Sequence, residues 1–259
     1  MRRYGIIGYP LEHSFSAEFF TRLFSRENIS AIYSALPAGS FEEVKLLLAD
    51  TSLLGCNITH PWKIDVINLL DELSPQAAEI GAVNVVARVK NTNLNTNNNK
   101  KTLLVGYNTD AEGFEVSIKN LLGEQLFKTP VKAIVLGTGG AAKCALFVLK
   151  KLNIPTIVVS RTSKGDINYS QLTITHFADH NLIVNCTPCG MFPHKDECPD
   201  IPYQYITEQH FVMDMIYNPE QTLFLRKAQL QGAHTLNGML MLTTQAAATW
   251  KIWQNAMGI

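Results

Sequence analysis

A glycine-rich turn between an apolar run and a helical pattern constrains this chain more than any other feature. Residues 133–136 read Ala-Ile-Val-Leu, and residues 137–142 read Gly-Thr-Gly-Gly-Ala-Ala. This satisfies G-x-G-x-x-A, the fingerprint of a dinucleotide-binding strand, turn and helix. Gly137 allows the tight turn, Gly139 lets a pyrophosphate approach, and Ala142 lets the helix pack on the strand. The sequence predicts a Rossmann-like domain that binds phosphates at this helix start, with a glycine-rich turn of another α/β domain as the alternative.

The residues after the next strand indicate which dinucleotide is bound. A fold that takes NAD carries Asp or Glu about 20 residues after the glycines, on the ribose 2′-hydroxyl. This chain has Ser160, Arg161, Thr162 and Lys164 there. Cations and hydroxyl donors suit a 2′-phosphate, so we predict NADP(H) as the cofactor; a basic surface turn is the alternative.

The rest of the chain alternates β-branched runs with amphipathic stretches, which indicates an α/β fold. In the first half we expect a parallel sheet from strands at 4–7, 31–35 and 54–58, followed by further strands at 83–89 and 102–107. Helices are expected at 17–24, 41–48, 62–70 and 75–80. The asparagine-rich residues 91–99 are predicted to be a hairpin loop. In the second half we expect helix 141–151, strands 157–160, 182–185 and 211–214, and a long helix within 237–259.

A length of 259 residues gives an expectation of one to two domains. Because residue 131 opens a new unit with its own strand and turn, we predict two. A substrate and catalytic domain is expected at residues 1–110, with helix 237–259 packing back on it. An NADP-binding domain is expected at residues 111–236.

Charge and composition exclude several classes of protein. Lys+Arg and Asp+Glu both number 22, so there is no basic excess for nucleic acid. No apolar run approaches the ~18–20 residues that cross a bilayer. The chain starts with basic residues and a short apolar run, but Gly8 and Pro10 interrupt that run before it could form the apolar region of a signal peptide. The five cysteines show no disulfide framework, which favours reduced thiols and a cytoplasmic location.

Three of those cysteine positions also permit a rival interpretation. Cys186, Cys189, His194 and Cys198 are spaced almost as in a zinc knuckle. Basic and aromatic flanks are missing, so we predict no metal site and no redox pair. His176 and His180 lack a third ligand and are predicted to be a surface pair.

Two polar segments follow strands of the first domain, where parallel α/β folds bind ligands. One ends in Lys63 and the other in Asp110. A lysine beside a carboxylate can orient and exchange the proton of a substrate hydroxyl. By themselves, these residues are equally a solvated lysine and a helix N-cap.

Seven segments spread over nearly the whole chain carry a much more specific signal. They are residues 57–63, 81–84, 108–110, 137–141, 161–162, 214–219 and 238–245. In order, they resemble N-V-T-x-P-x-K, G-A-V-N, N-T-D, G-x-G-G-A, the end of N-R-T, D-x-x-Y-x-P and G-x-x-M-L-x-x-Q of the shikimate dehydrogenase family. Residues 185–191 also resemble that family's N-x-T-x-x-G-M, which explains this stretch without zinc.

The resemblance implies reversible hydride transfer between NADPH and 3-dehydroshikimate, giving shikimate for chorismate and aromatic amino-acid biosynthesis. It implies Lys63 and Asp110 as the catalytic pair. It implies substrate contacts from Ser14, Ser16, Asn57, Thr59, Asn84, Asp110, Tyr217 and Gln245. It implies cofactor contacts from Gly137, Thr138, Gly139, Gly140, Ala141, Ser160, Arg161, Thr162, Lys164, Met215 and Gly238. A monomer or a homodimer is expected, with no nucleic-acid or membrane partner.

Departures from the family pattern leave alternatives open. Ser160 replaces the asparagine of N-R-T, and Lys164 stands where arginine is common, which predicts weaker 2′-phosphate affinity. Within enzymes, the alternatives are a quinate/shikimate dehydrogenase with relaxed cofactor use or a related dehydrogenase acting on a folate. Outside enzymes, the alternative is a catalytically silent NADP-binding regulator, which would need neither Lys63 nor Asp110. Ser16 is equally well explained as an N-cap, or with Ser14 as a receptor for the substrate carboxylate.

Overall fold

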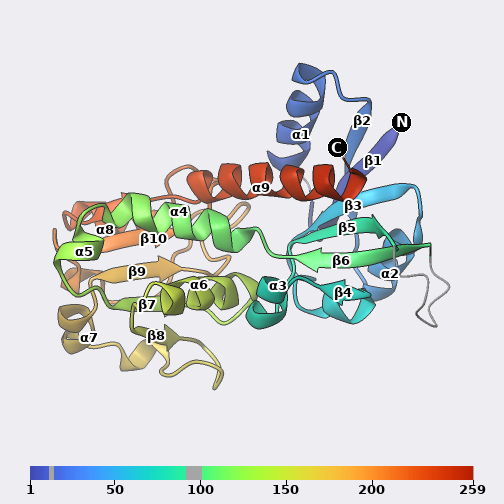
Figure 1. Ribbon diagram of the computed structural model, residues 1–259. Helices are drawn as coiled ribbons and strands as arrows, with labels where there is room; N and C mark the ends of the chain where they lie inside the picture. The colour runs from blue at the N-terminus through green and yellow to red at the C-terminus, as the bar shows by residue number, and fades with distance from the viewer. Residues whose placement is uncertain (12–14, 92–100, 259) are drawn as a thin grey trace. The chain divides into compact units, whose positions relative to one another are not determined.

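The computed structural model describes residues 1–11, 15–91 and 101–258 (Figure 1). Contacts divide the chain into two compact units. Unit 1 comprises residues 1–109 and 246–259, and unit 2 comprises residues 110–245. The chain therefore enters unit 2 once and returns to complete unit 1.

Unit 1 is built on a mixed sheet with strand order β2-β1-β3-β5-β6-β4. The strands are β1 (Arg2–Gly8), β2 (Ala31–Pro37), β3 (Leu53–Ile58), β4 (Glu72–Leu73), β5 (Val85–Lys90) and β6 (Thr102–Tyr107). The helices are α1 (Phe15–Arg26), α2 (Phe41–Ala49) and α3 (Pro75–Ile80), with a 3-10 turn at Asp65–Leu69. β1 pairs in parallel with β2 and β3, whereas β5 runs antiparallel to β3 and β6.

Local sequence signals explain where the helices of unit 1 begin and end. Ser40 caps α2, accepting from the N–H of Glu43, whose carboxylate accepts from the Ser40 N–H. Ser74 caps α3 by accepting from the Ala77 N–H, with Pro75 at the first helical position, and Gly81 ends the helix with φ +67°. These are the residue types that satisfy the unpaired backbone groups of helix ends.

The core of unit 1 is closed by the C-terminal helix, α9 (Met239–Met257). Its Trp253 is 1% exposed, stacks on Tyr4 with ring centroids 4.6 Å apart, and donates from Nε1 to the Val86 carbonyl at 3.1 Å. A Cβ at Gly55 would lie 2.3 Å from that Nε1, so only glycine leaves room for the indole.

Unit 2 has a wholly parallel sheet in the order β11-β10-β9-β7-β8. The strands are β7 (Ala133–Leu136), β8 (Thr156–Val159), β9 (Leu182–Asn185), β10 (Phe211–Asp214) and β11 (His234–Leu236). The helices are α4 (Asp110–Leu122), α5 (Gln125–Lys128), α6 (Gly140–Lys151), α7 (Ile174–Asp179) and α8 (Leu223–Leu230), followed by the start of α9. The three central strands, β7, β9 and β10, are buried over most of their length, as parallel strands covered on both faces must be.

The predicted α/β fold is confirmed, with differences in detail. The strands at 4–7, 31–35 and 54–58 are parallel as predicted, and residues 83–89 and 102–107 form the antiparallel pair β5 and β6 that the predicted hairpin requires. The sheet is nevertheless mixed and not parallel, because β5 runs antiparallel to β3. The helix predicted at 62–70 is wrong in type, because residues 61–64 turn before the 3-10 helix Asp65–Leu69. The predicted hairpin loop 91–99 lies outside the described residues from 92 onward. No helix in the described ranges is both long and apolar enough to cross a membrane.

Candidate active site

The glycine-rich turn leaves β7 at the point where the chain order of the sheet reverses. β8 lies on one side of β7 and β9 on the other, which is where open α/β sheets bind their ligands. Gly137 adopts φ +108°, a conformation that L side chains rarely adopt, and its N–H donates to the Val159 carbonyl at 2.9 Å. The turn thus has the geometry that its sequence predicts.

Gly139 gives the turn its capacity for a ligand. It is exposed at the N-cap of α6, and a Cβ built on it would meet no described atom within 4 Å. The helix has no side-chain cap, so nothing of that kind competes for its first N–H groups. Ala142 is fully buried in the first turn of α6. An open backbone at a helix N-terminus is the arrangement that accepts a pyrophosphate, so the residues present fit a dinucleotide.

The predicted 2′-phosphate segment follows β8 as a compact turn. Ser160 is buried, and its Oγ accepts from the Thr162 N–H at 3.2 Å. Thr162 Oγ1 in turn accepts from the Lys164 N–H at 3.4 Å. Arg161 and Lys164 are exposed, and neither forms an ion pair with another residue that the structure describes. Two cations are therefore available to an anion at this end of the sheet.

Met215 and Gly238 are brought together at the end of β10. The Met215 N–H donates to the Asn185 carbonyl at 3.1 Å, and the Gly238 N–H donates to the Ile216 carbonyl at 3.0 Å. A Cβ at Gly238 would lie 2.2 Å from the Met215 carbonyl oxygen, so glycine is required for this approach. Tyr217 follows, half-buried, in the same segment.

A buried polar network occupies the interior of unit 1. The Tyr33 hydroxyl donates to Asn57 Oδ1 at 2.8 Å and hydrogen-bonds with Ser16. Asn57 Nδ2 donates to the Asn84 carbonyl at 3.3 Å and to Thr249 Oγ1 at 3.4 Å. Burial raises the pKa of Tyr33 well above its ordinary value, so the hydroxyl keeps its proton and stays a donor.

The same network fixes the segment that precedes Asp110. Asn84 Oδ1 accepts from the Thr109 N–H at 2.7 Å, and Asn84 Nδ2 donates to Thr109 Oγ1 at 2.9 Å. Thr109 Oγ1 also lies 3.1 Å from Thr249 Oγ1. Of the predicted substrate residues, the structure therefore joins Ser16, Asn57 and Asn84 in one network.

Two members of this network, Tyr33 and Thr249, were missed by the sequence analysis. Tyr33 gave no signal beyond its place in a strand. Thr249 lies one helical turn after Gln245, so the family match at Gln245 marked the right face of α9. Both residues are buried.

The remaining predicted residues are placed individually. Thr59 and Lys63 follow β3 and are half-buried, and the Lys63 carbonyl accepts from the Val83 N–H at 2.8 Å. Asp110 is buried as the first residue of α4, and buried Gln245 donates to the Leu242 carbonyl at 2.9 Å. Ser16 lies within the first turn of α1, which begins at Phe15, so the N-cap alternative is wrong. Ser14 lies outside the described residues.

The cysteine and histidine positions have structural contacts. In the described ranges, no three His, Cys, Asp or Glu side chains are grouped as a metal ion requires. His176 caps α7, accepting at Nδ1 from the Thr173 N–H at 3.1 Å. Cys186 is buried, and Cys198 Sγ lies 3.2 Å from Nζ of Lys227.

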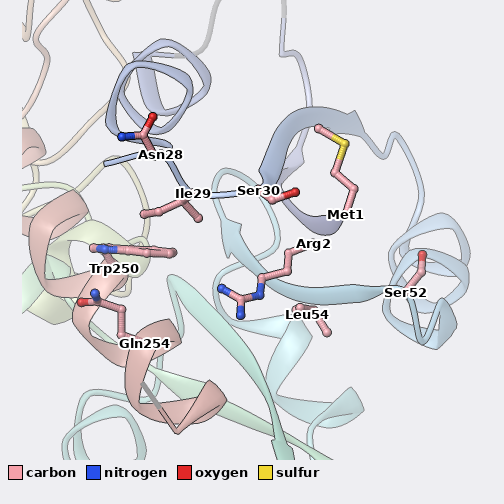
Figure 2. Close-up of a pocket in the computed structure, with 9 residues that line it drawn as sticks. All are labelled: Met1, Arg2, Asn28, Ile29, Ser30, Ser52, Leu54, Trp250 and Gln254. Carbon is pink, nitrogen blue, oxygen red and sulfur yellow. The ribbon is translucent and has the colours of Figure 1, made fainter. Parts of the chain in front are cut away.

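A surface pocket of about 660 Å³ lies elsewhere in unit 1 (Figure 2). Arg2 and Leu54 line it at the starts of β1 and β3, together with Trp250 and Gln254 of α9. The predicted substrate residues of unit 1 instead follow the carboxyl ends of strands or belong to the buried network. Among the predicted site residues that the structure describes, none lines this pocket.

Comparisons with known proteins show which family this chain resembles. The model of the shikimate dehydrogenase substrate binding domain matches residues 6–86. A shikimate dehydrogenase (NADP(+)) of Desulforamulus reducens is 34% identical, covering 96% of this chain and 88% of its own. Shikimate dehydrogenase 1 from Peptoclostridium difficile is 31% identical with TM-score 0.81, covering 98% of this chain and 92% of that chain. Shikimate 5-dehydrogenase from Thermus thermophilus, solved with NADP(H) and shikimate, is 27% identical with TM-score 0.80. The match covers 98% of this chain and 94% of that chain.

Proposed function

The chain belongs to the shikimate dehydrogenase family, and we propose that it catalyses reversible hydride transfer between NADPH and 3-dehydroshikimate, giving shikimate. The observation that carries this is the open backbone at Gly139, followed after one strand by exposed Arg161 and Lys164. A pyrophosphate fits the first and a 2′-phosphate fits the second. The reaction belongs to aromatic amino-acid biosynthesis by way of chorismate.

The dinucleotide residues divide into three groups by what they offer. Residues 137–141 form the turn that leads into α6, whose first backbone N–H groups have no side-chain cap. Ser160, Arg161, Thr162 and Lys164 present the charges and hydroxyls for a 2′-phosphate. Met215 and Gly238, joined by the close approach described above, shape the end of β10. When bound there, NADPH supplies the hydride.

The substrate residues are proposed to be Ser14, Ser16, Asn57, Thr59, Asn84, Asp110, Tyr217 and Gln245. They are mostly neutral hydroxyls and amides, which both donate and accept, as a ring with several hydroxyl groups requires. The contacts from Tyr33 and Thr109 hold the Asn57 and Asn84 amides in fixed orientations. An analogue that lacked a hydroxyl would leave such groups unpaired, and this gives the site its selectivity.

Lys63 and Asp110 are proposed as the catalytic pair. The Lys63 ammonium donates a proton to the ring oxygen as the ketone is reduced, and it takes the proton back in the reverse direction. The Asp110 carboxylate holds the lysine and the substrate hydroxyl in register. A silent regulator would need neither residue, and the curated relatives at this identity are named as enzymes.

We assign NADP binding to unit 2 and most of the substrate residues to unit 1. Asp110, Tyr217 and Gln245 are the substrate residues that belong to unit 2. The sequence had placed residues 237–259 with the substrate domain, whereas contacts group residues 246–259 with unit 1 and residues 237–245 with unit 2. We further propose a cytoplasmic monomer or homodimer with its five cysteines reduced and with no nucleic-acid or membrane partner.

The test is the initial rate of NADP⁺ reduction at 340 nm with shikimate, beside quinate and beside NAD⁺. A fast rate with shikimate and NADP⁺ supports substrate and cofactor together. Activity chiefly with quinate or NAD⁺ would mean that the enzyme prefers that substrate or cofactor. Folded protein that binds NADP⁺ without any activity would favour the silent regulator.

Lys63→Ala tests the catalytic assignment. We expect kcat to fall by about 10²- to 10⁴-fold, with an unchanged circular dichroism spectrum. Lys45→Ala is the matched control, because Lys45 is an exposed lysine of unit 1 paired with Glu42. An unchanged kcat in Lys63→Ala would remove Lys63 from the mechanism.

A further inference from the structure

The most deeply buried carboxyl group described in unit 2 is that of Asp214, at the end of β10. Its side chain is 0% exposed, yet three donors reach it. Oδ1 accepts from Asn185 Nδ2 at 3.0 Å and from the Ile216 N–H at 3.1 Å, and Oδ2 accepts from Thr222 Oγ1 at 2.7 Å. Burying a carboxyl group costs free energy, so the contacts that it makes indicate its role.

One of these contacts leads to the glycine-rich turn. Asn185 Oδ1 accepts from the Thr187 N–H at 3.0 Å and from its hydroxyl at 2.6 Å. Thr187 packs directly against the turn, because a Cβ at Gly137 would lie 3.0 Å from its methyl carbon. Asp214 thus orients Asn185, and Asn185 holds the residue that bounds the turn.

The other two contacts lead to the segment between β10 and α8. The Ile216 N–H that Asp214 accepts from lies between Met215 and Tyr217, and the Ile216 carbonyl accepts from Gly238 at 3.0 Å. Thr222, bonded to Oδ2, is the N-cap of α8 and accepts from the Leu225 N–H at 3.3 Å. Both ends of the segment that carries Met215 and Tyr217 are therefore tied to one carboxyl group.

We propose that Asp214 is a positioning residue for the dinucleotide site, and that its charged form is the one that holds both walls of that site for NADP(H). This rests on the proposed function, because it takes the glycine-rich turn and Met215 as cofactor contacts. The carboxylate touches neither wall directly and acts through Asn185 and Ile216. Hydrogen bonds to a charged acceptor are about twice as strong as neutral ones, so removing the charge loosens both walls.

The surroundings of Asp214 make this charge sensitive to pH. The titratable groups that face it are the Cys186 and Cys189 thiols, from the segment after β9, and the Tyr203 phenol. None of these is a cation. Burial therefore raises the pKa of Asp214 to about 6, with the hydrogen bonds from Thr222, Ile216 and Asn185 opposing the shift.

Protonation reverses one of the three bonds. A proton on Oδ2 makes the carboxyl group a donor to Thr222 Oγ1, which already accepts from Leu225. The bonds to Asn185 and Ile216 then lose their charge assistance. Asp214→Asn mimics this state at every pH, because its amide Nδ2 donates where Oδ2 accepted while Oδ1 still accepts.

The experiment is isothermal titration calorimetry of NADP⁺ binding to wild type and Asp214→Asn at pH 5, 6, 7 and 8. The quantity compared is the ratio of the two Kd values, because titration of the 2′-phosphate affects both proteins equally and cancels. We expect Asp214→Asn to bind about tenfold more weakly at pH 8, with the ratio falling toward one at pH 5. The matched control is Asp179→Asn, an exposed aspartate of α7, whose ratio should stay at one.

A ratio that is the same at every pH overturns the proposal, whether that constant value is one or ten. A wild-type protein that binds no NADP⁺ at any pH overturns the proposed function itself. If Asp214→Asn does not fold, Thr222→Val provides the second test. Loss of the donor to Oδ2 should move the midpoint of the pH dependence of Kd to higher pH, and an unmoved midpoint refutes the role of Asp214.

Discussion

Gly55→Ala tests whether the core of unit 1 depends on the contact between β3 and the C-terminal helix. The new methyl group would lie 2.3 Å from Trp253 Nε1, 2.7 Å from Cδ1 and 2.9 Å from Cε2. The indole has little room to retreat, because its ring centroid lies 4.6 Å from that of Tyr4 and 5.1 Å from that of Phe20. One of the two partners must therefore shift.

The magnitude follows from two terms. Overpacking a well-filled core costs about 1–3 kcal/mol. Displacing the indole also breaks its bond to the Val86 carbonyl, and a buried group left unpaired costs about 1–3 kcal/mol. A shift that relieves the clash incurs part of the overpacking cost and part of the cost of the lost hydrogen bond. We therefore expect Gly55→Ala to lower the free energy of unfolding of unit 1 by about 3 kcal/mol.

The assay is urea unfolding followed by tryptophan fluorescence. Trp62, Trp250 and Trp253 are the three tryptophans of the chain and all belong to unit 1, so the signal reports this unit alone. Gly39→Ala is the matched control, since its Cβ would meet ordinary contacts at 3.8 and 3.9 Å, and we expect a change within about 0.5 kcal/mol.

A double-mutant cycle isolates the contact. Trp253→Leu removes the indole atoms that the methyl group meets and leaves Trp62 and Trp250 as reporters. Gly55→Ala in that background should then cost less than about 1 kcal/mol, which gives a coupling of about 2 kcal/mol. The reasoning is refuted if Gly55→Ala is as harmless as Gly39→Ala, or if its cost is the same in both backgrounds.

Three further predictions follow from the site and its surroundings. Arg161→Ala should raise KM for NADP⁺ about tenfold in steady-state assays while KM for NAD⁺ changes little, because only NADP⁺ carries the 2′-phosphate; an equal rise for both would contradict the assignment. Asp214, whose pKa of about 6 lies above its ordinary 3.8, binds a proton more readily folded than unfolded, so its contribution to stability is present at pH 4 and lost as pH rises through 6. Urea titrations of wild type and Asp214→Asn should show the wild type losing about 2 kcal/mol relative to the variant between pH 4 and pH 7, whereas a constant difference would refute the shift. Burial raises the pKa of Cys56 to about 12 and also raises that of Cys186, so both should resist N-ethylmaleimide at pH 8 until the protein is unfolded; peptide mass mapping would detect the opposite.

Features set by neighbouring residues were predictable from the sequence. The turn needs a positive φ at Gly137 and an open backbone at Gly139, and glycines two residues apart in the sequence indicate both. Helix 75–80 was placed at its observed bounds because Ser74 and Pro75 start it and Gly81 ends it. Such signals involve contacts within a few residues, which a single sequence displays directly.

Features set by distant residues were not predictable in this way. Tyr33 and Thr249 meet at Asn57 although they are far apart in the chain, so neither carries a local mark of its role. The antiparallel pairing of β5 with β3 also joins strands that no short turn connects, and a buried apolar run looks the same in either direction. β4 has only two residues, too few for any periodicity.

The discontinuity of unit 1 has a consequence for synthesis on the ribosome. Unit 2 is a single uninterrupted stretch, residues 110–245, so it is complete before Trp253 has been added. Until then Tyr4 and Phe20 lack the Trp253 indole that packs between them and Gly55 of β3. We therefore expect unit 2 to be able to fold before unit 1, whereas the amino-terminal domain of a chain usually folds first. During this interval the amino-terminal part of the nascent chain exposes an apolar surface, to which a chaperone could bind.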